Sequence, residues 1–131
     1  MSTPCPCGRL DAKKQPLVYM TCCDQYHEGE LTAPDAESLM RSRYSAFVLE
    51  KAGYLLSTWH SSQRPASLEF EPGAKWLGLQ VQNHQVIDAT HAEVTLVARQ
   101  RDRTGRAIRL HERSRIVCEN GSWYCVDGDS L

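Results

Sequence analysis

Residues 39–48 restrict the fold of this chain more than any other stretch, because they read Leu-Met-Arg-Ser-Arg-Tyr-Ser-Ala-Phe-Val. At about 100° per residue, four apolar side chains share one face of a helix: Ala36, Leu39, Met40 and Phe47. Arg43 falls in the middle of that face, whereas Arg41 projects away from it and is expected in solvent. A buried charge without a partner is too costly to keep. The pattern therefore predicts a core helix over 34–49 whose Arg43 meets a buried anion.

The segments on either side of this helix complete a helical region. Thr32 or Asp35 can cap its start, because a short polar side chain satisfies free backbone amides there. Apolar positions at helical spacing predict a second helix over 51–58, followed directly by His60. A histidine at the C-terminal end of a helix is favoured in its charged form. It is either a capping residue or a member of a site.

From residue 76 the apolar period changes to two, which is typical of strands. Alternation predicts strands over 77–82, 92–99, 106–118 and 122–127, with a turn at 102–105. Asn120-Gly121 is a strong signal for a two-residue hairpin loop. Helices followed by a long antiparallel meander predict an α+β domain in which a curved sheet wraps on the helices.

The Asn120-Gly121 hairpin also predicts a register, in which Ile116 lies opposite Cys125 and Ser114 lies opposite Asp127. Glu112, Ser114 and Asp127 then lie on an otherwise apolar inward face. We therefore expect Arg43 to pair with Glu112 or Asp127 across the core. The pair is either a structural tie or part of a polar pocket between helices and sheet. The candidate pocket residues are Arg43, Tyr44, Trp59, His60, Glu112, Ser114 and Asp127.

Four of the six cysteines lie in the first 23 residues, as Cys5-Pro-Cys7 and Cys22-Cys23. Two close pairs separated by a loop suit a tetrahedral thiolate site. In such a site four soft ligands bind a structural Zn²⁺. A tight turn or a helix start could bring the adjacent pair to one ion. Four unrelated thiols, a disulfide, and His27 in place of Cys23 are the alternatives.

Composition narrows the setting of the protein. The formal net charge is -1, so no global attraction to nucleic acid or anionic membrane is expected. No apolar run approaches the roughly 20 residues of a membrane span. The N-terminus lacks the basic and apolar regions of a signal peptide. These features predict a cytoplasmic protein that does not enter the membrane.

Arginines gather around the predicted hairpin, where only Asp102 and Glu112 offset them. They form either a solvated sheet face or a basic surface for RNA, the ribosome or an acidic protein. The chain is expected to be a monomer or a weak homodimer, because such a face pairs poorly with a copy of itself. The candidate partner residues are Arg99, Arg101, Arg109, Arg113 and Arg115, flanked by Arg103 and Arg106.

Two resemblances add to these predictions. Cys-Pro-Cys-Gly at 5–8, Lys13-Lys14, Tyr19 and Cys22-Cys23 resemble a SEC-C motif, the small zinc element at the C-terminus of the SecA translocation ATPase. That resemblance implies the zinc ligands Cys5, Cys7, Cys22 and Cys23. The order of helices and strands resembles the nuclear transport factor 2-like (cystatin-like) cone. The resemblance implies a pocket within the cone, which some relatives use for isomerase or dehydratase chemistry.

Motifs along nearly the whole chain resemble the YchJ family of uncharacterised bacterial proteins. They include Arg-Ser-Arg-Tyr at 41–44, Thr-Trp-His at 58–60, Trp-Leu-Gly-Leu at 76–79, Glu-Arg-Ser-Arg at 112–115 and Gly-Ser-Trp-Tyr at 121–124. The resemblance implies a SEC-C-like zinc element over 1–30 and a nuclear transport factor 2-like domain over 31–131. It implies no established activity.

Two classes of function remain after these steps. The first is a zinc-stabilised adaptor module that binds a protein or a nucleic acid. The second is a small-molecule enzyme, of isomerase, dehydratase or hydrolase type, that uses the pocket. The first is favoured, because buried charges are more often structural than catalytic. A zinc with four thiolates would be structural in either class, since it leaves no open position for water.

Overall fold

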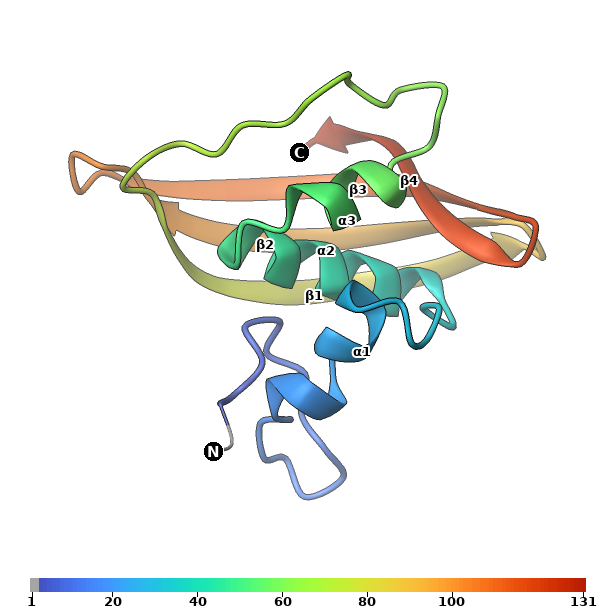
Figure 1. Ribbon diagram of the computed structural model, residues 1–131, viewed down its shortest axis with the longest axis horizontal. Coiled ribbons are helices and arrows are strands. Elements are labelled where there is room, and N and C mark those ends of the chain that lie inside the picture. The colour runs from blue at the N-terminus through green and yellow to red at the C-terminus, as the bar shows by residue number, and fades with distance from the viewer. Residues whose placement is uncertain (1–2) are drawn as a thin grey trace.

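The computed structural model describes residues 3–131, which form four helical segments and one sheet (Figure 1). The helical segments precede all of the strands in the chain: η1 Tyr19–Thr21, α1 Asp24–His27, α2 Ala36–Val48 and α3 Ala52–Ser57. The strands follow as a meander in which every neighbouring pair is antiparallel, in the order β1 Lys75–Asp88, β2 His91–Arg101, β3 Ala107–Glu119 and β4 Ser122–Ser130. The predicted α+β arrangement is confirmed.

Helix α2 forms where the apolar periodicity placed a helix, and its start is fixed by a cap. The Asp35 carboxylate accepts a hydrogen bond of 2.7 Å from the backbone N–H of Ser38. That bond satisfies one of the amides that a helix N-terminus leaves free. The chain leaves α2 through Glu50, whose φ of 56° is left-handed. This turn allows α3 to begin at Ala52 and to pack beside α2.

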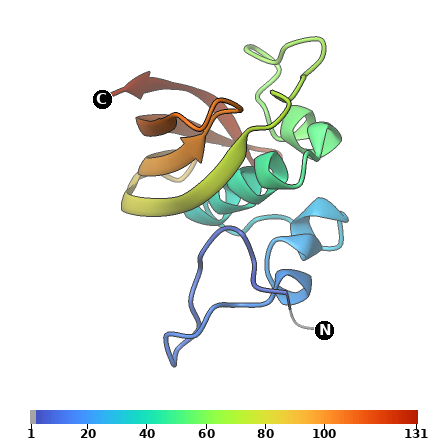
Figure 2. The same cartoon turned by 90° about the vertical axis from the view of Figure 1, so that its left-hand side faces the viewer.

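The core lies between α2 and the inward face of the sheet. Alternate β2 residues are buried there, as the period of two predicts: Ala92, Val94, Leu96 and Ala98. Leu39 of α2 and Ile116 of β3 join the same cluster, and each is 1% exposed. Figure 2 shows α2 lying in the curve of the sheet, with the N-terminal segment below α2 and the β1 edge.

The β3–β4 register follows the hairpin prediction only as far as Ile116, which pairs with Cys125. A β-bulge then shifts the register, so that Arg115 pairs with Asp127 and Ser114 with Gly128. The predicted pairing of Ser114 with Asp127 is wrong, because a bulge inserts one extra residue and turns later side chains to the other face. The Asp127 carboxylate lies 2.6 Å from Arg115 Nε, on the outer face.

Gly128 is the signal in the sequence that could have revealed this bulge. A Cβ at this position would lie 3.0 Å from the carbonyl oxygen of Arg113 and 3.3 Å from Cα of Ser114. A glycine inside a strand often marks a bulge or a close backbone approach.

No helix in the described part of the chain is both long and apolar enough to cross a membrane.

Candidate metal centre and core cavity

The four N-terminal cysteines meet at one point. Their Sγ atoms all lie within 4.8 Å of one another. Two of the separations are 3.6 Å, between Cys7 and Cys22, and 3.9 Å, between Cys22 and Cys23. Zinc–thiolate bonds of about 2.3 Å give a tetrahedron with edges of about 3.8 Å. The geometry and chemistry of the donors therefore fit a four-thiolate metal site, and no Cys side chain in the cluster is more than 8% exposed.

Short backbone contacts hold the two cysteine pairs in place. The Cys5 N–H donates to the Leu17 carbonyl at 2.8 Å, which closes a loop between the pairs. The chain turns after Cys7 at Gly8, whose φ of 76° suits glycine. Cys22 follows η1 and Cys23 caps the start of α1. The adjacent pair thus reaches one point through a helix start, one of the two ways expected from the sequence.

The four thiols titrate as one group, with two pKa values lowered and two raised. Hydrogen bonds from Cys22 and Cys23 lower the pKa of the Cys7 thiol to about 7. The same two neighbours also lower the pKa of Cys5. The hydrogen bond to Cys22 raises the pKa of Cys23, because the protons are shared within the group. A divalent cation would stabilise all four thiolates together and release their protons.

His27 lies beside the cluster but does not join it. Its Nε2–H donates to the Ser42 carbonyl at 2.7 Å, so Nδ1 accepts from the Tyr19 hydroxyl at 2.6 Å. Both ring nitrogens are therefore used in tying the N-terminal element to α2. Burial lowers the pKa of His27, which favours the neutral ring that this pairing needs. These contacts favour Cys23 over His27 as the fourth ligand.

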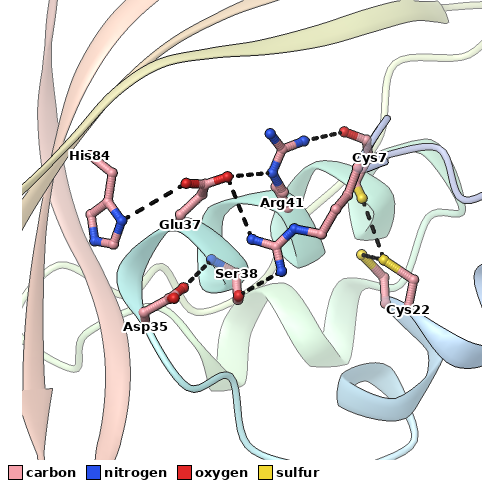
Figure 3. Close-up of polar contacts among 9 residues, drawn as sticks. Cys7, Cys22, Asp35, Glu37, Ser38, Arg41 and His84 are labelled. Carbon is pink, nitrogen blue, oxygen red and sulfur yellow. Dashed lines mark hydrogen bonds and ion pairs between the residues drawn. The ribbon is translucent and has the colours of Figure 1, made fainter. Parts of the chain in front are cut away.

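Arg41 connects the cysteine cluster to α2, as Figure 3 shows. Its Nη1 donates to the Cys7 carbonyl and its Nε to the Glu37 carboxylate, both at 2.8 Å. The side chain is 16% exposed, so the expectation that it would be solvated is wrong. Periodicity placed Arg41 on the side of α2 that faces away from the sheet. The cysteine element covers this side of the helix, so Arg41 is shielded from solvent. Arg9 adds a 3.0 Å hydrogen bond to Ser38 Oγ of the same helix.

Replacing Arg41 with methionine is expected to loosen this junction. The change leaves the Cys7 carbonyl and the Glu37 carboxylate without their shared donor, and hydrogen bonds to charged groups are worth about 1.5–3 kcal/mol. We expect the free energy of unfolding to fall by about that amount in urea denaturation. Lys13→Met, at an exposed position of the N-terminal cysteine element, should change the free energy of unfolding by less than about 0.5 kcal/mol. Equal stability of the two variants would contradict the role given to Arg41.

A cavity of about 380 Å³ lies between α2 and the inward face of the sheet. Six of the seven predicted pocket residues line it: Arg43, Tyr44, Trp59, Glu112, Ser114 and Asp127. His60 does not, because its ring lies 2.9 Å from Glu119 and 2.7 Å from Ser62 at the surface. Asp127 borders the cavity, but its carboxylate is held by Arg115 outside. His60 therefore lies outside the cavity, and Asp127 lines it with its carboxylate engaged in an ion pair.

Arg43 is 5% exposed and meets no carboxylate, so the ion pair predicted with Glu112 or Asp127 is wrong. Its Nη1 donates to the Leu55 carbonyl at 2.9 Å and to Thr58 Oγ1 at 2.7 Å. Leu55 lies in the last turn of α3, whose free carbonyls carry partial negative charge. Trp59 adds its ring face, 5.2 Å from the guanidinium carbon. The C-terminal end of α3 thus replaces the expected anion.

Sequence reasoning missed Trp76 and Cys125 as cavity residues. Trp76 lies at the start of β1 and meets the ring of Tyr44 edge to face at 5.6 Å. Cys125 was placed on the inward face by the hairpin register, which was the available signal. Burial raises the pKa of its thiol, although the Arg43 charge opposes that shift. Cys125 therefore lines the cavity as a neutral thiol.

The basic outer face of the sheet divides into two parts. Arg113 and Arg115 are neutralised by Asp127 and Asp129, with an Arg115–Asp129 distance of 2.8 Å. The expectation that only Asp102 and Glu112 offset the arginines is wrong, because the bulge turns Asp127 outward. The other part, which we call the basic sheet end, has no ion pair among the described residues. It consists of the exposed side chains Lys75, Arg99, Arg101 and Arg109.

Comparison with known proteins gives matches over the whole chain. Residues 35–128 match the family model described as the YchJ middle NTF2-like domain. A UPF0225 protein of Polaromonas naphthalenivorans is 61% identical across the full length of both chains. A UPF0225 protein of Bordetella pertussis is 56% identical, over 95% of this chain and 91% of that one.

Two solved structures resemble the chain, and both are described as SEC-C motif containing proteins. The solution structure of one from Rhodopseudomonas palustris has a TM-score of 0.79 at 26% identity, covering 89% of this chain and 94% of that one. The crystal structure of one from Psychrobacter arcticus has a TM-score of 0.78 at 35% identity, covering 95% of this chain and 80% of that one.

Proposed function

The chain belongs to the YchJ family of UPF0225 proteins, and from this premise we propose that it is a zinc-stabilised adaptor module. The observation that carries the proposal is the meeting of four buried cysteine Sγ atoms within 4.8 Å. Cys5, Cys7, Cys22 and Cys23 would hold Zn²⁺ as a closed site. Such a site contributes folding free energy but leaves no open position for water, so the metal has a structural role.

The basic sheet end supplies a surface for the partner. Arg99 on β2 lies directly opposite Arg109 on β3, and Lys75 on β1 lies opposite Arg101. Like charges directly opposite each other destabilise a sheet. A bound anion would offset that cost, which favours a partner that brings phosphates or carboxylates to this end. The partner is accordingly a nucleic acid or an acidic protein, bound through its negative groups.

Neutralising the basic sheet end is expected to weaken this binding. The test measures fluorescence anisotropy with a labelled RNA duplex and with labelled polyglutamate, at several salt concentrations. Arg99→Gln/Arg109→Gln should lose at least about tenfold in affinity for the probe that binds, because each contact with a charged group is worth about 1.5–3 kcal/mol. The slope of affinity against salt should also become shallower.

Arg113→Gln is the matched control, since its guanidinium already pairs with Asp129 at 3.3 Å. It should bind the same probe with nearly unchanged affinity. Equal losses in the two variants would mean that only overall charge matters. If the wild-type protein binds neither RNA nor polyglutamate at low salt, the adaptor role of this surface is excluded.

A further inference from the structure

We propose that the core cavity binds a small organic anion with an apolar body, and that Arg43 holds its anionic group. The cavity volume, about 380 Å³, lies in the range of small-molecule sites. Its walls come from α2, from all four strands and from Trp59 after α3. The site is separate from the basic sheet end, because inward and outward side chains alternate along each strand.

Arg43 is the first reason to expect an anion. Within the described residues, its guanidinium donates hydrogen bonds only through Nη1 and has no carboxylate partner. Among the described residues, every side-chain nitrogen or oxygen that is fully enclosed has a hydrogen-bond partner. The unbonded Nε and Nη2 atoms of Arg43 must therefore reach open space, and the space that Arg43 lines is the core cavity. A ligand carboxylate, sulfonate or phosphate would accept these remaining donors.

The charge balance of Arg43 gives the same answer. Burial lowers the pKa of a guanidinium, yet arginine stays protonated in proteins. Two neutral acceptors and the face of Trp59 compensate only part of the cost of burying that charge. Glu112 also lines the cavity, but among the described residues no carboxylate forms an ion pair with Arg43, so its guanidinium is available to an incoming anion. The same cation would add nothing to the binding of a neutral apolar molecule.

The rest of the lining selects the body of the ligand. Aromatic rings surround the space, contributed by Tyr44, Phe47, Trp59 and Trp76. Such walls favour an aromatic or compact aliphatic body, which gains from apolar burial and ring contacts. Ser114 is 2% exposed and its hydroxyl has no hydrogen bond among the described residues, so by the same reasoning its Oγ faces the cavity. It offers a second polar contact on β3.

The test compares two probes that differ in one charge. The anionic probe is 8-anilinonaphthalene-1-sulfonate, and the neutral probe is N-phenyl-1-naphthylamine, which has the same rings and N–H but no sulfonate. Both are titrated by fluorescence into the wild-type protein and into three variants. Arg43→Met removes the charge, Ala98→Phe fills the cavity from β2, and Arg113→Met removes a charge from the outer face of β3, between the cavity residues Glu112 and Ser114.

We expect the wild-type protein to bind the anionic probe at least about tenfold more tightly than the neutral one. Arg43→Met should abolish that preference, Ala98→Phe should abolish the binding of both probes, and Arg113→Met should behave like the wild type. Equal affinity of the two probes for the wild type would overturn the proposal, as would failure of both to bind. Retained preference in Arg43→Met, or retained binding in Ala98→Phe, would place the probe elsewhere and overturn it too.

Folding of Arg43→Met is checked by circular dichroism before titration. It should fold, because no carboxylate is left unpaired when the guanidinium is removed. If it does not, the wild-type preference and the Ala98→Phe and Arg113→Met results still decide the question. A melting temperature that rises with the anionic probe in the wild type, and not in Ala98→Phe, is the second measurement.

Discussion

Replacing Cys22 and Cys23 together with serine is expected to remove about one bound zinc per chain and to unfold the N-terminal element. The change deletes two of the four thiolates that meet within 4.8 Å. Serine hydroxyls are poor ligands for this ion, and two remaining thiolates do not close its shell. The segment before α2 has little apolar core beyond the cysteines themselves, with only Leu17 and Tyr19 packed against them. We therefore expect its order to depend on a bound metal.

Elemental analysis of the purified protein, together with amide exchange, would measure both effects. The matched control is Cys118→Ser on β3, outside the cluster, which should keep its zinc and its N-terminal protection. The Arg41 and His27 contacts should be lost together with the metal in the double variant. Protein that contains no zinc, or a double variant that keeps full zinc and protection, would refute the structural role of the metal.

The architecture could be predicted because its signals are local. Apolar spacing gave α2 within two residues at each end, and Asn120-Gly121 gave the register as far as Ile116 and Cys125. The bulge beyond that point could not be counted from alternation, because a period of two assumes that no residue is inserted. Asp127 was therefore predicted to lie in the core, whereas the bulge places its carboxylate on the outer face.

Arg41 was predicted to be solvated and Arg43 to pair with a carboxylate, and both predictions were wrong for a related reason. A charge pattern shows only other charged side chains, whereas both guanidinium groups bind backbone carbonyls, of Cys7 and Leu55. Those carbonyls are free because one belongs to a tight turn and the other to the end of a short helix. The cysteine cluster could be predicted more fully, since ligand type and spacing carry the chemistry directly.

Leu39→Ala is expected to cost about 2–5 kcal/mol of unfolding free energy, the largest effect expected of a single substitution in the sheet-bearing domain. Leu39 is 1% exposed and packs in the core cluster between α2 and the sheet. Its loss would leave a cavity that rigid strands cannot fill. Urea denaturation followed by tryptophan fluorescence measures the change, because Trp76 and Trp123 pack against the same cluster.

Leu77→Ala is the control, since that leucine is 52% exposed on β1 and should cost less than about 0.5 kcal/mol. Zinc content, measured together with urea denaturation, tests whether the two predicted domains, 1–30 and 31–131, are stable independently of each other. If each has its own source of stability, Leu39→Ala should keep its zinc while the sheet-bearing domain weakens, and Cys22→Ser/Cys23→Ser should lose zinc while that domain stays folded. Loss of both properties in either variant would instead mean that α2, which contacts both parts, makes the chain a single folding unit.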